Sequence, residues 1–310
     1  MNAILFPGQG SQIVGMGSEF YNNFQIVKEI FAEADEKLKY KISKIILEGP
    51  ENELKLTRNT QPAILTVSFA IFSVLKKEFN FNFNETKFFA GHSLGEYSAL
   101  VCSESLAFND AIFLLFERGK AMQEAVPVGK GSMIAVLGLS IKEVNNFLKL
   151  IKTEGVCEIA NDNADGQAIL SGDKNSMEEI KYILKENKKK FIPLNVSAPF
   201  HCALMNPAAN IMENKINSIH FKKPLFDIIS NVTSEAENNP EKIKKLLIEQ
   251  IYSSVRWRES ILNISKHKVT DFIEIGPGKV LSGMVKRTVK NINCFSINSI
   301  DDIKKLLNEF

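Results

Sequence analysis

Apolar and polar positions in the first part of the chain alternate between short apolar runs, as in buried strands, and a spacing of three or four residues, as in helices. Residues 3–6 form a short apolar run that stops at Pro7-Gly8-Gln9-Gly10, which predicts a buried strand leading into a tight loop. Apolar residues between Val27 and Leu38 recur every three or four positions, as on one face of an amphipathic helix. Residues 87–90 predict a second strand, and further helical patterns follow it. Strands that alternate with helices are typical of a parallel sheet covered on both faces.

A long helix is predicted between those two strands. Thr60-Gln61-Pro62 opens it, and Pro62 is expected in its first turn, where the missing proline N–H has no intrahelical partner in any case. The weakly polar stretch at 62–75 is only about 14 residues long, whereas a bilayer span needs roughly 20. The pattern therefore predicts a buried helix and no membrane span.

The segment from residue 128 to 196 has a different pattern. Its predicted strands and helices follow the order β-α-β-β-α-β, which is that of a ferredoxin-like unit. Ser140 is expected to cap its first helix, and the turn-rich residues 161–166 are expected to connect its second and third strands. Because α/β patterns resume after residue 196, we expect this unit to be inserted into one discontinuous α/β domain of residues 1–127 and 197–310.

Composition narrows the class of protein. The chain has 310 residues, of which 45% are hydrophobic and 24% are charged, the balance of a soluble globular protein. A formal net charge of +2 provides no overall field that would attract nucleic acid or an anionic membrane. Four well-separated cysteines predict reduced thiols rather than a disulfide or zinc framework. The first residues lack the pattern of a signal peptide, so we expect a cytoplasmic protein with no metal, nucleic-acid or membrane partner.

A nucleophile motif lies between the predicted strand at 87–90 and a predicted helix at 94–101. Gly91-His92-Ser93-Leu94-Gly95 fits the pattern G-x-S-x-G. In this context the serine occupies a strained turn, and the backbone N–H of Leu94 points from the helix start toward any oxyanion formed there. The alternative is a chance match in a glycine-rich turn, and the strand-turn-helix context favours a nucleophile over it.

A serine nucleophile needs a base, and the chain contains four histidines. His92 adjoins Ser93 and is expected to point away from it, while His220 and His267 lie in basic surface segments. His201 follows the last strand of the inserted unit, where the chain returns to the main domain, and this position favours it as the base. No acidic third member of a catalytic triad is evident. The candidates between Ser93 and His201 are aspartates that do not end a strand of the predicted main sheet, namely Asp110, Asp162, Asp165 and Asp173.

Six sequence blocks occur in order over nearly the whole chain: FPGQGSQ at 6–12, TQPA at 60–63, GHSLGEYSALV at 91–101, RGKAMQEAVP at 118–127, SAPFHCALM at 197–205 and EIGPGKVLSGMVKRT at 274–288. Together they resemble the malonyl-CoA:acyl carrier protein transacylase family. The resemblance implies a hydrolase-like, parallel-sheet α/β domain with a ferredoxin-like insert. It also implies ping-pong transfer of a malonyl group from malonyl-CoA to a serine, and then to the phosphopantetheine thiol of acyl carrier protein in fatty-acid synthesis, with no bound cofactor.

The resemblance implies roles for individual residues. The catalytic ones are Ser93 as nucleophile, His201 as base, the backbone N–H groups of Gln9 and Leu94 as oxyanion donors, and the main-chain carbonyl of Gln250, which orients the histidine and accounts for the missing acid. The substrate-binding ones are Arg118 for the malonyl carboxylate, Phe200 beside the malonyl α-carbon, and Gln61.

The residues alone leave alternatives open. A guanidinium can hold a carboxylate through two parallel hydrogen bonds. The residues alone favour a surface Arg118 paired with Glu117 or Glu96, and it is the family resemblance that favours substrate recognition. Phe200 could be an ordinary packing residue. The same serine and histidine would also serve a thioesterase that releases acyl groups to water. A catalytically silent scaffold that binds acyl carrier protein is the third hypothesis, and the presence together of Gln9, Ser93, Arg118 and His201 speaks against it.

Overall fold

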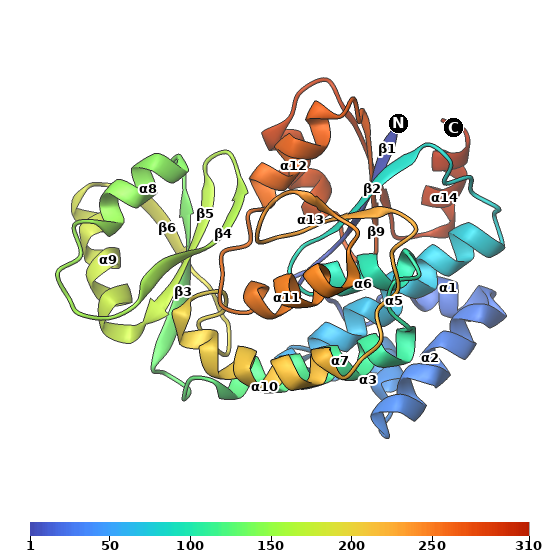
Figure 1. Cartoon of the computed structure of the whole chain (residues 1–310), viewed down its shortest axis with the longest axis horizontal. Coiled ribbons are helices and arrows are strands. Elements are labelled where there is room, and N and C mark those ends of the chain that lie inside the picture. The colour runs from blue at the N-terminus through green and yellow to red at the C-terminus, as the bar shows by residue number, and fades with distance from the viewer. Residues whose placement is uncertain (310) are drawn as a thin grey trace.

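A six-stranded sheet forms the centre of the larger part of the molecule (Figure 1). The computed structural model describes residues 1–309. The strands are β1 Asn2–Phe6, β2 Thr86–Gly91, β7 Asp227–Ile229, β8 Ala236–Glu237, β9 Asp271–Ile275 and β10 Asn293–Ile297. Their order is β10-β9-β1-β2-β7-β8, and all neighbours are parallel except β7 and β8. The expected α/β class with a parallel-sheet core is confirmed.

Helices cover both faces of this sheet. They are α1 Ser18–Asn23, α2 Gln25–Leu38, α3 Ile42–Glu48, α4 Glu51–Leu54, α5 Thr57–Lys77, α6 Gly95–Cys102, α7 Phe108–Glu124, η1 Ala203–Met205, α10 Asn206–Asn217, α11 Pro240–Gln250, α12 Trp257–Lys266, α13 Val280–Thr288 and α14 Ile300–Leu307. In β1, Ile4 and Phe6 belong to the core that contains α2, α5 and α7, whereas Ala3 and Leu5 belong to the core that contains α12 and α13. Alternate side chains of a strand point to opposite faces, so an uninterrupted apolar strand requires this double cover.

A second, antiparallel sheet lies beside the first (Figure 1). Its elements are β3 Gly131–Leu137, α8 Ile141–Leu148, β4 Cys157–Ala164, β5 Gln167–Asp173, α9 Lys174–Glu186 and β6 Lys190–Pro193. The strand order β4-β5-β3-β6 and the β-α-β-β-α-β succession are those of a ferredoxin-like unit. Ser140 caps α8 by accepting a hydrogen bond from the Glu143 N–H, as expected. These elements fall within residues 128–196, and the domain boundaries themselves stay a prediction.

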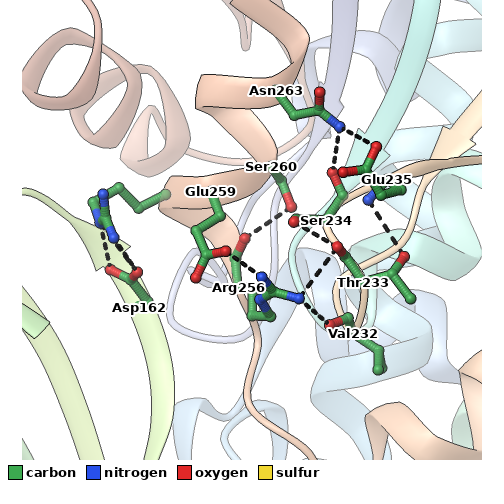
Figure 2. Close-up of polar contacts among 10 residues, drawn as sticks. Asp162, Val232, Thr233, Ser234, Glu235, Arg256, Glu259, Ser260 and Asn263 are labelled. Atoms are coloured by element: carbon green, nitrogen blue, oxygen red, sulfur yellow. Dashed lines mark hydrogen bonds and ion pairs between the residues drawn. The ribbon is translucent and has the colours of Figure 1, made fainter. Parts of the chain in front are cut away.

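Strand β4 connects the two sheets. The carboxylate of Asp162 accepts hydrogen bonds from Arg258 Nε at 2.9 and 3.0 Å, a contact that Figure 2 includes at Asp162. Backbone hydrogen bonds also connect β4 to residue 255. The Asp162 N–H donates to the Val255 carbonyl at 3.0 Å, and the Val255 N–H donates to the Ala160 carbonyl at 2.8 Å. The small sheet is therefore fixed against the loop that leads into α12.

Two expectations about local structure are wrong. Helix α5 begins at Thr57, so Pro62 lies inside the helix and not in its first turn. A contact distant in sequence supports the earlier start, because Gln123 Oε1 accepts the Thr57 N–H at 3.1 Å. Residues 161–164 of the expected turn at 161–166 belong to β4 instead, and only residues 165 and 166 form the turn. The side chains of Asp162 and Asn163 and the Asp162 backbone N–H find partners outside the small sheet, on Arg258, His92 and Val255, which offsets the low strand propensity of these residues.

The turn after β2 leaves no room for a side chain at Gly91. A Cβ there would lie 1.9 Å from the backbone carbonyl carbon and oxygen of Gly95. We expect Gly91→Ala to lower the free energy of unfolding by at least about 3 kcal/mol. Gly283→Ala in α13 is the control, since a Cβ there meets no atom within 4 Å and a helical alanine stabilises by up to about 1 kcal/mol. Denaturant titrations measure both, and a Gly91→Ala protein as stable as wild type would contradict the tight packing.

Candidate active site

Ser93 lies in the sharp turn between β2 and α6, as the G-x-S-x-G pattern predicts. Its φ of 53° is in the left-handed region, which is strained for a residue other than glycine. The end of β1 approaches the turn closely, since a Cβ on Gly95 would lie 2.2 Å from the Phe6 carbonyl oxygen. Ser93 lines a cavity of about 210 Å³ between the main sheet and the small one.

His201 is the histidine that contacts Ser93. Its Nε2 lies 2.8 Å from Ser93 Oγ, and its Nδ1 lies 2.8 Å from the main-chain carbonyl oxygen of Gln250. Because a carbonyl oxygen only accepts hydrogen bonds, Nδ1 carries the proton and Nε2 is free to accept the serine hydroxyl. The carbonyl therefore stands where a Ser-His-Asp triad has its carboxylate. His92 instead bonds through Nε2 to Asn163 Oδ1 at 2.9 Å.

The surroundings of His201 favour its neutral form. Burial, together with the nearby Arg118 cation, lowers the pKa of His201 to about 3. The imidazole is therefore unprotonated near neutral pH, which is the state a base needs. Its φ of 57° places a second left-handed residue in the same site.

Arg118 is buried beside the serine, with 1% of its surface exposed. It comes from α7 and donates to Gln61 Oε1 at 2.8 Å, to Gln250 Oε1 at 2.8 Å and to Ser93 Oγ at 3.2 Å. Within residues 1–309 no carboxylate forms an ion pair with it, and Glu117 pairs with Lys215 at 3.0 Å instead. The guanidinium is thus held by neutral amides, and the alternative of a surface ion pair is wrong.

The remaining predicted site residues line the same cavity. Gln9, Leu94, Gln61 and Phe200 all contribute to its wall. No hydrogen bond among the described residues uses the backbone N–H of Gln9 or of Leu94. Both groups are therefore available as donors. Phe200 is buried beside His201, so its ring restricts the space near the nucleophile.

Comparison with known proteins identifies the family. A family model described as an acyl transferase domain matches residues 4–306. A malonyl CoA-acyl carrier protein transacylase of Bacillus subtilis (strain 168) is 43% identical over 304 residues, which cover 97% of this chain and 95% of that protein. The chain belongs to the malonyl-CoA:acyl carrier protein transacylase family. The Escherichia coli (strain K12) protein of the same name is 39% identical over 297 residues, 96% of this chain and 95% of that one.

Solved structures of this transacylase family share the whole fold. An acyl-carrier-protein-S-malonyltransferase from Bartonella henselae superposes with a TM-score of 0.96 at 42% identity, covering 99% of this chain and 98% of that one. A malonyl-transacylase in complex with its type II PKS acyl-carrier protein superposes with a TM-score of 0.95 at 38% identity, covering 100% and 99%. The resemblance noted from the sequence blocks is confirmed.

Sequence reasoning gave no site role to four polar residues that lie at or behind this cavity, although Glu96 was considered as an ion-pair partner of Arg118. Asn161 and Asn163 line the cavity from β4, and Glu96 and Asn231 lie buried behind Ser93. The two asparagines stand two positions apart, as side chains on one face of a strand do, but their segment had the composition of a turn. Glu96 lies inside a family block, whereas nothing in the sequence around Asn231 indicates a role.

The described residues contain neither a metal-binding cluster nor a membrane-spanning helix. Within residues 1–309, no group of three or more His, Cys, Asp or Glu side chains is arranged to hold a metal ion. In the same part of the chain, no helix combines the length and the apolar character that crossing a bilayer requires.

The depressed pKa of His201 predicts the pH dependence of Ser93 reactivity. With a pKa of about 3, the His201 imidazole is almost entirely neutral at about pH 5, so reaction of Ser93 with a fluorophosphonate probe should remain fast down to about that pH. Burial raises the pKa of Glu96 to about 7, so that carboxyl could add its own inflection. Rates measured in wild type and in Glu96→Gln separate the two groups. An inflection near the ordinary histidine value of 6.5 that persists in Glu96→Gln would contradict the account of His201.

Proposed function

We propose that this chain transfers the malonyl group of malonyl-CoA to the phosphopantetheine thiol of acyl carrier protein, through a malonyl-Ser93 intermediate, and so supplies fatty-acid synthesis. The observation that carries the proposal is the buried Arg118 guanidinium, which lies beside Ser93 and lacks a carboxylate partner. A negatively charged acyl group would complete it. The names of the relatives and the complex of one of them with its carrier protein support the same donor and acceptor.

In the first half-reaction, His201 Nε2 removes the Ser93 hydroxyl proton as Oγ attacks the thioester carbonyl carbon. The negative charge that develops on the carbonyl oxygen is stabilised by the backbone N–H groups of Gln9 and Leu94. The carbon–sulfur bond then breaks, and the proton on His201 passes to the departing CoA sulfur. The main-chain carbonyl of Gln250 holds the protonated imidazole through Nδ1 during this step.

The second half-reaction reverses these steps with a different thiol. The phosphopantetheine thiol gives its proton to His201 Nε2 and attacks the malonyl-serine ester. The carbon–oxygen bond to Ser93 breaks, and Oγ recovers the proton from His201. Hydrolysis would follow the same path with water as acceptor, so a thioesterase and a transferase differ in the acceptor that reaches the ester and not in the dyad.

Selectivity for malonyl follows from the residues around Arg118. The guanidinium binds the free carboxylate of the acyl group through paired hydrogen bonds. Gln61 holds one side of the guanidinium, which fixes its direction. The ring of Phe200 limits the room beside the malonyl α-carbon and disfavours a branched acyl group.

The domain division is part of this proposal. Residues 1–127 and 197–310 form the catalytic domain, since all the residues assigned catalytic or substrate-binding roles come from them. Residues 128–196 form an inserted domain that supplies one wall of the cavity, including Asn161 and Asn163. A cytoplasmic location, where malonyl-CoA and the carrier protein are available, belongs to the proposal as well.

Intact-mass measurement after mixing with malonyl-CoA tests the proposed function. We expect one malonyl adduct per chain, mapped to Ser93, and none in Ser93→Ala. In His201→Ala the adduct should form roughly 10²- to 10⁴-fold more slowly, the range for removal of a general base. His92→Ala is the matched control and should keep most of the rate.

Adding carrier protein in the same experiment distinguishes transfer from hydrolysis. The proposal predicts that the malonyl mass moves from the enzyme to the phosphopantetheine arm faster than it is lost to water. An adduct that persists in Ser93→Ala, or that always decays to free malonate, would overturn the proposal.

A further inference from the structure

The serine turn is held from behind by Asn231, a residue with no role in the proposed mechanism. Asn231 follows β7 and is fully buried. Its side-chain Nδ2 donates to the Gly91 carbonyl at 2.8 Å, and its Oδ1 accepts the Ser93 N–H at 2.7 Å. One amide therefore bridges the end of β2 and the strained residue that follows it.

Glu96 connects Asn231 to Gln250. It is 2% exposed, in the first turn of α6, and its Oε2 accepts the Asn231 backbone N–H at 3.2 Å and Gln250 Nε2 at 2.7 Å. Because a carboxylate oxygen accepts hydrogen bonds, it turns the NH₂ group of Gln250 toward itself. The amide oxygen of Gln250 then faces Arg118, to which it bonds at 2.8 Å.

Both peptide groups of Ser93 are fixed by this arrangement. Asn231 takes the Ser93 N–H, while the Ser93 carbonyl accepts from Gln250 Nε2 and from the Glu96 backbone N–H, each at 3.0 Å. A serine keeps a left-handed backbone conformation only where surrounding contacts hold it there against the strain. These contacts supply that constraint, and they leave the next N–H, that of Leu94, without an acceptor beside the cavity.

The loop that carries Asn231 is itself anchored, and Figure 2 shows the contacts of the residues directly after it, from Val232 to Glu235. The Arg256 backbone N–H donates to the Asn231 carbonyl at 2.9 Å, and its guanidinium donates to the carbonyls of Val232 and Thr233 at 3.2 Å. Asn263 Nδ2 donates to the Ser234 carbonyl at 2.8 Å. Asn231 thus reaches the serine turn from a rigid support.

We propose that Asn231 and Glu96 are positioning residues, which hold Ser93 in its left-handed conformation and aim the Gln250 amide oxygen at Arg118. The proposal deepens the proposed function and rests on it for the malonyl substrate. Neither side chain contacts the cavity, so both act through Ser93 and Gln250. An uncharged amide at position 96 keeps an oxygen acceptor in the same place, which makes Glu96→Gln the conservative replacement.

The test compares single-turnover acylation by malonyl-CoA in Asn231→Ala, Glu96→Ala, Glu96→Gln and the control Asn263→Ala. We expect the first two to lower the acylation rate constant by about 10- to 100-fold, because each removes buried hydrogen bonds that hold the serine turn. The KM for malonyl-CoA should change by less than about threefold. Glu96→Gln should stay within about threefold of wild type. Asn263→Ala removes a hydrogen bond three residues further along the loop, at Ser234. The Arg256 contacts to Asn231, Val232 and Thr233 stay in place, so this variant should keep the wild-type rate.

Two additions make the test decisive. Asn231→Asp keeps the acceptor for the Ser93 N–H but turns its second oxygen toward the Gly91 carbonyl oxygen, so it should lose at least as much rate as Asn231→Ala. If neither variant folds, the comparison of Glu96→Ala with Glu96→Gln carries the test. The double variant of Asn231→Ala and Glu96→Ala should acylate at about the rate of the slower single variant. The two effects should not add, because both substitutions free the same turn.

Labelling of Ser93 by a fluorophosphonate, run in parallel, separates this proposal from the function. If wild type takes the probe but no malonyl group, the malonyltransferase proposal fails, and the probe rates of the variants still test the positioning role. Wild-type probe and acylation rates in Asn231→Ala would overturn the positioning role. So would equal losses in Glu96→Gln and Glu96→Ala, or in Asn263→Ala and Asn231→Ala.

Discussion

The buried guanidinium of Arg118 is the constraint on which the site depends. Removing a cation from water is unfavourable unless hydrogen bonds and an opposite charge replace the water. Here the hydrogen bonds come from Gln61 and Gln250. Within residues 1–309 no carboxylate forms an ion pair with Arg118, and the buried Glu96 carboxyl acts on it only through their electrostatic attraction. The free protein therefore retains a desolvated positive charge next to its nucleophile. That charge also helps to keep His201 neutral.

Gln250 connects the three functional groups. Its main-chain carbonyl accepts from His201, its side-chain oxygen accepts from Arg118, and its NH₂ group donates to the Ser93 carbonyl. A side-chain carboxylate in place of this carbonyl would add a negative charge within reach of Arg118 and would compete with an anionic substrate. A neutral carbonyl orients the imidazole without that competition, which is a physical reason for a dyad in place of a triad.

The sequence allowed prediction of the fold class, the serine turn and the base, because each has a local signal. The strand-turn-helix context indicates Ser93, and elimination among four histidines indicates His201. Glu96 and Asn231 could not be predicted, since their partners lie on elements far apart in the chain. The strand at residues 161–164 was missed for the same reason, because Asp162 and Asn163 find their hydrogen-bond partners outside the small sheet.

Arg118 is expected to bind the carboxylate of the acyl group, and kcat/KM for malonyl-CoA and acetyl-CoA tests this role directly. In Arg118→Ala the malonyl value should fall by about 30- to several-thousand-fold relative to the acetyl value, because only malonyl loses a charged partner. Arg118→Lys should recover part of the preference, since it keeps the charge but not the paired donors. Arg118 also donates a hydrogen bond to Ser93. Loss of that bond should lower kcat/KM for both substrates and therefore cancels in the malonyl-to-acetyl ratio. An unchanged malonyl-to-acetyl ratio in Arg118→Ala would contradict the account.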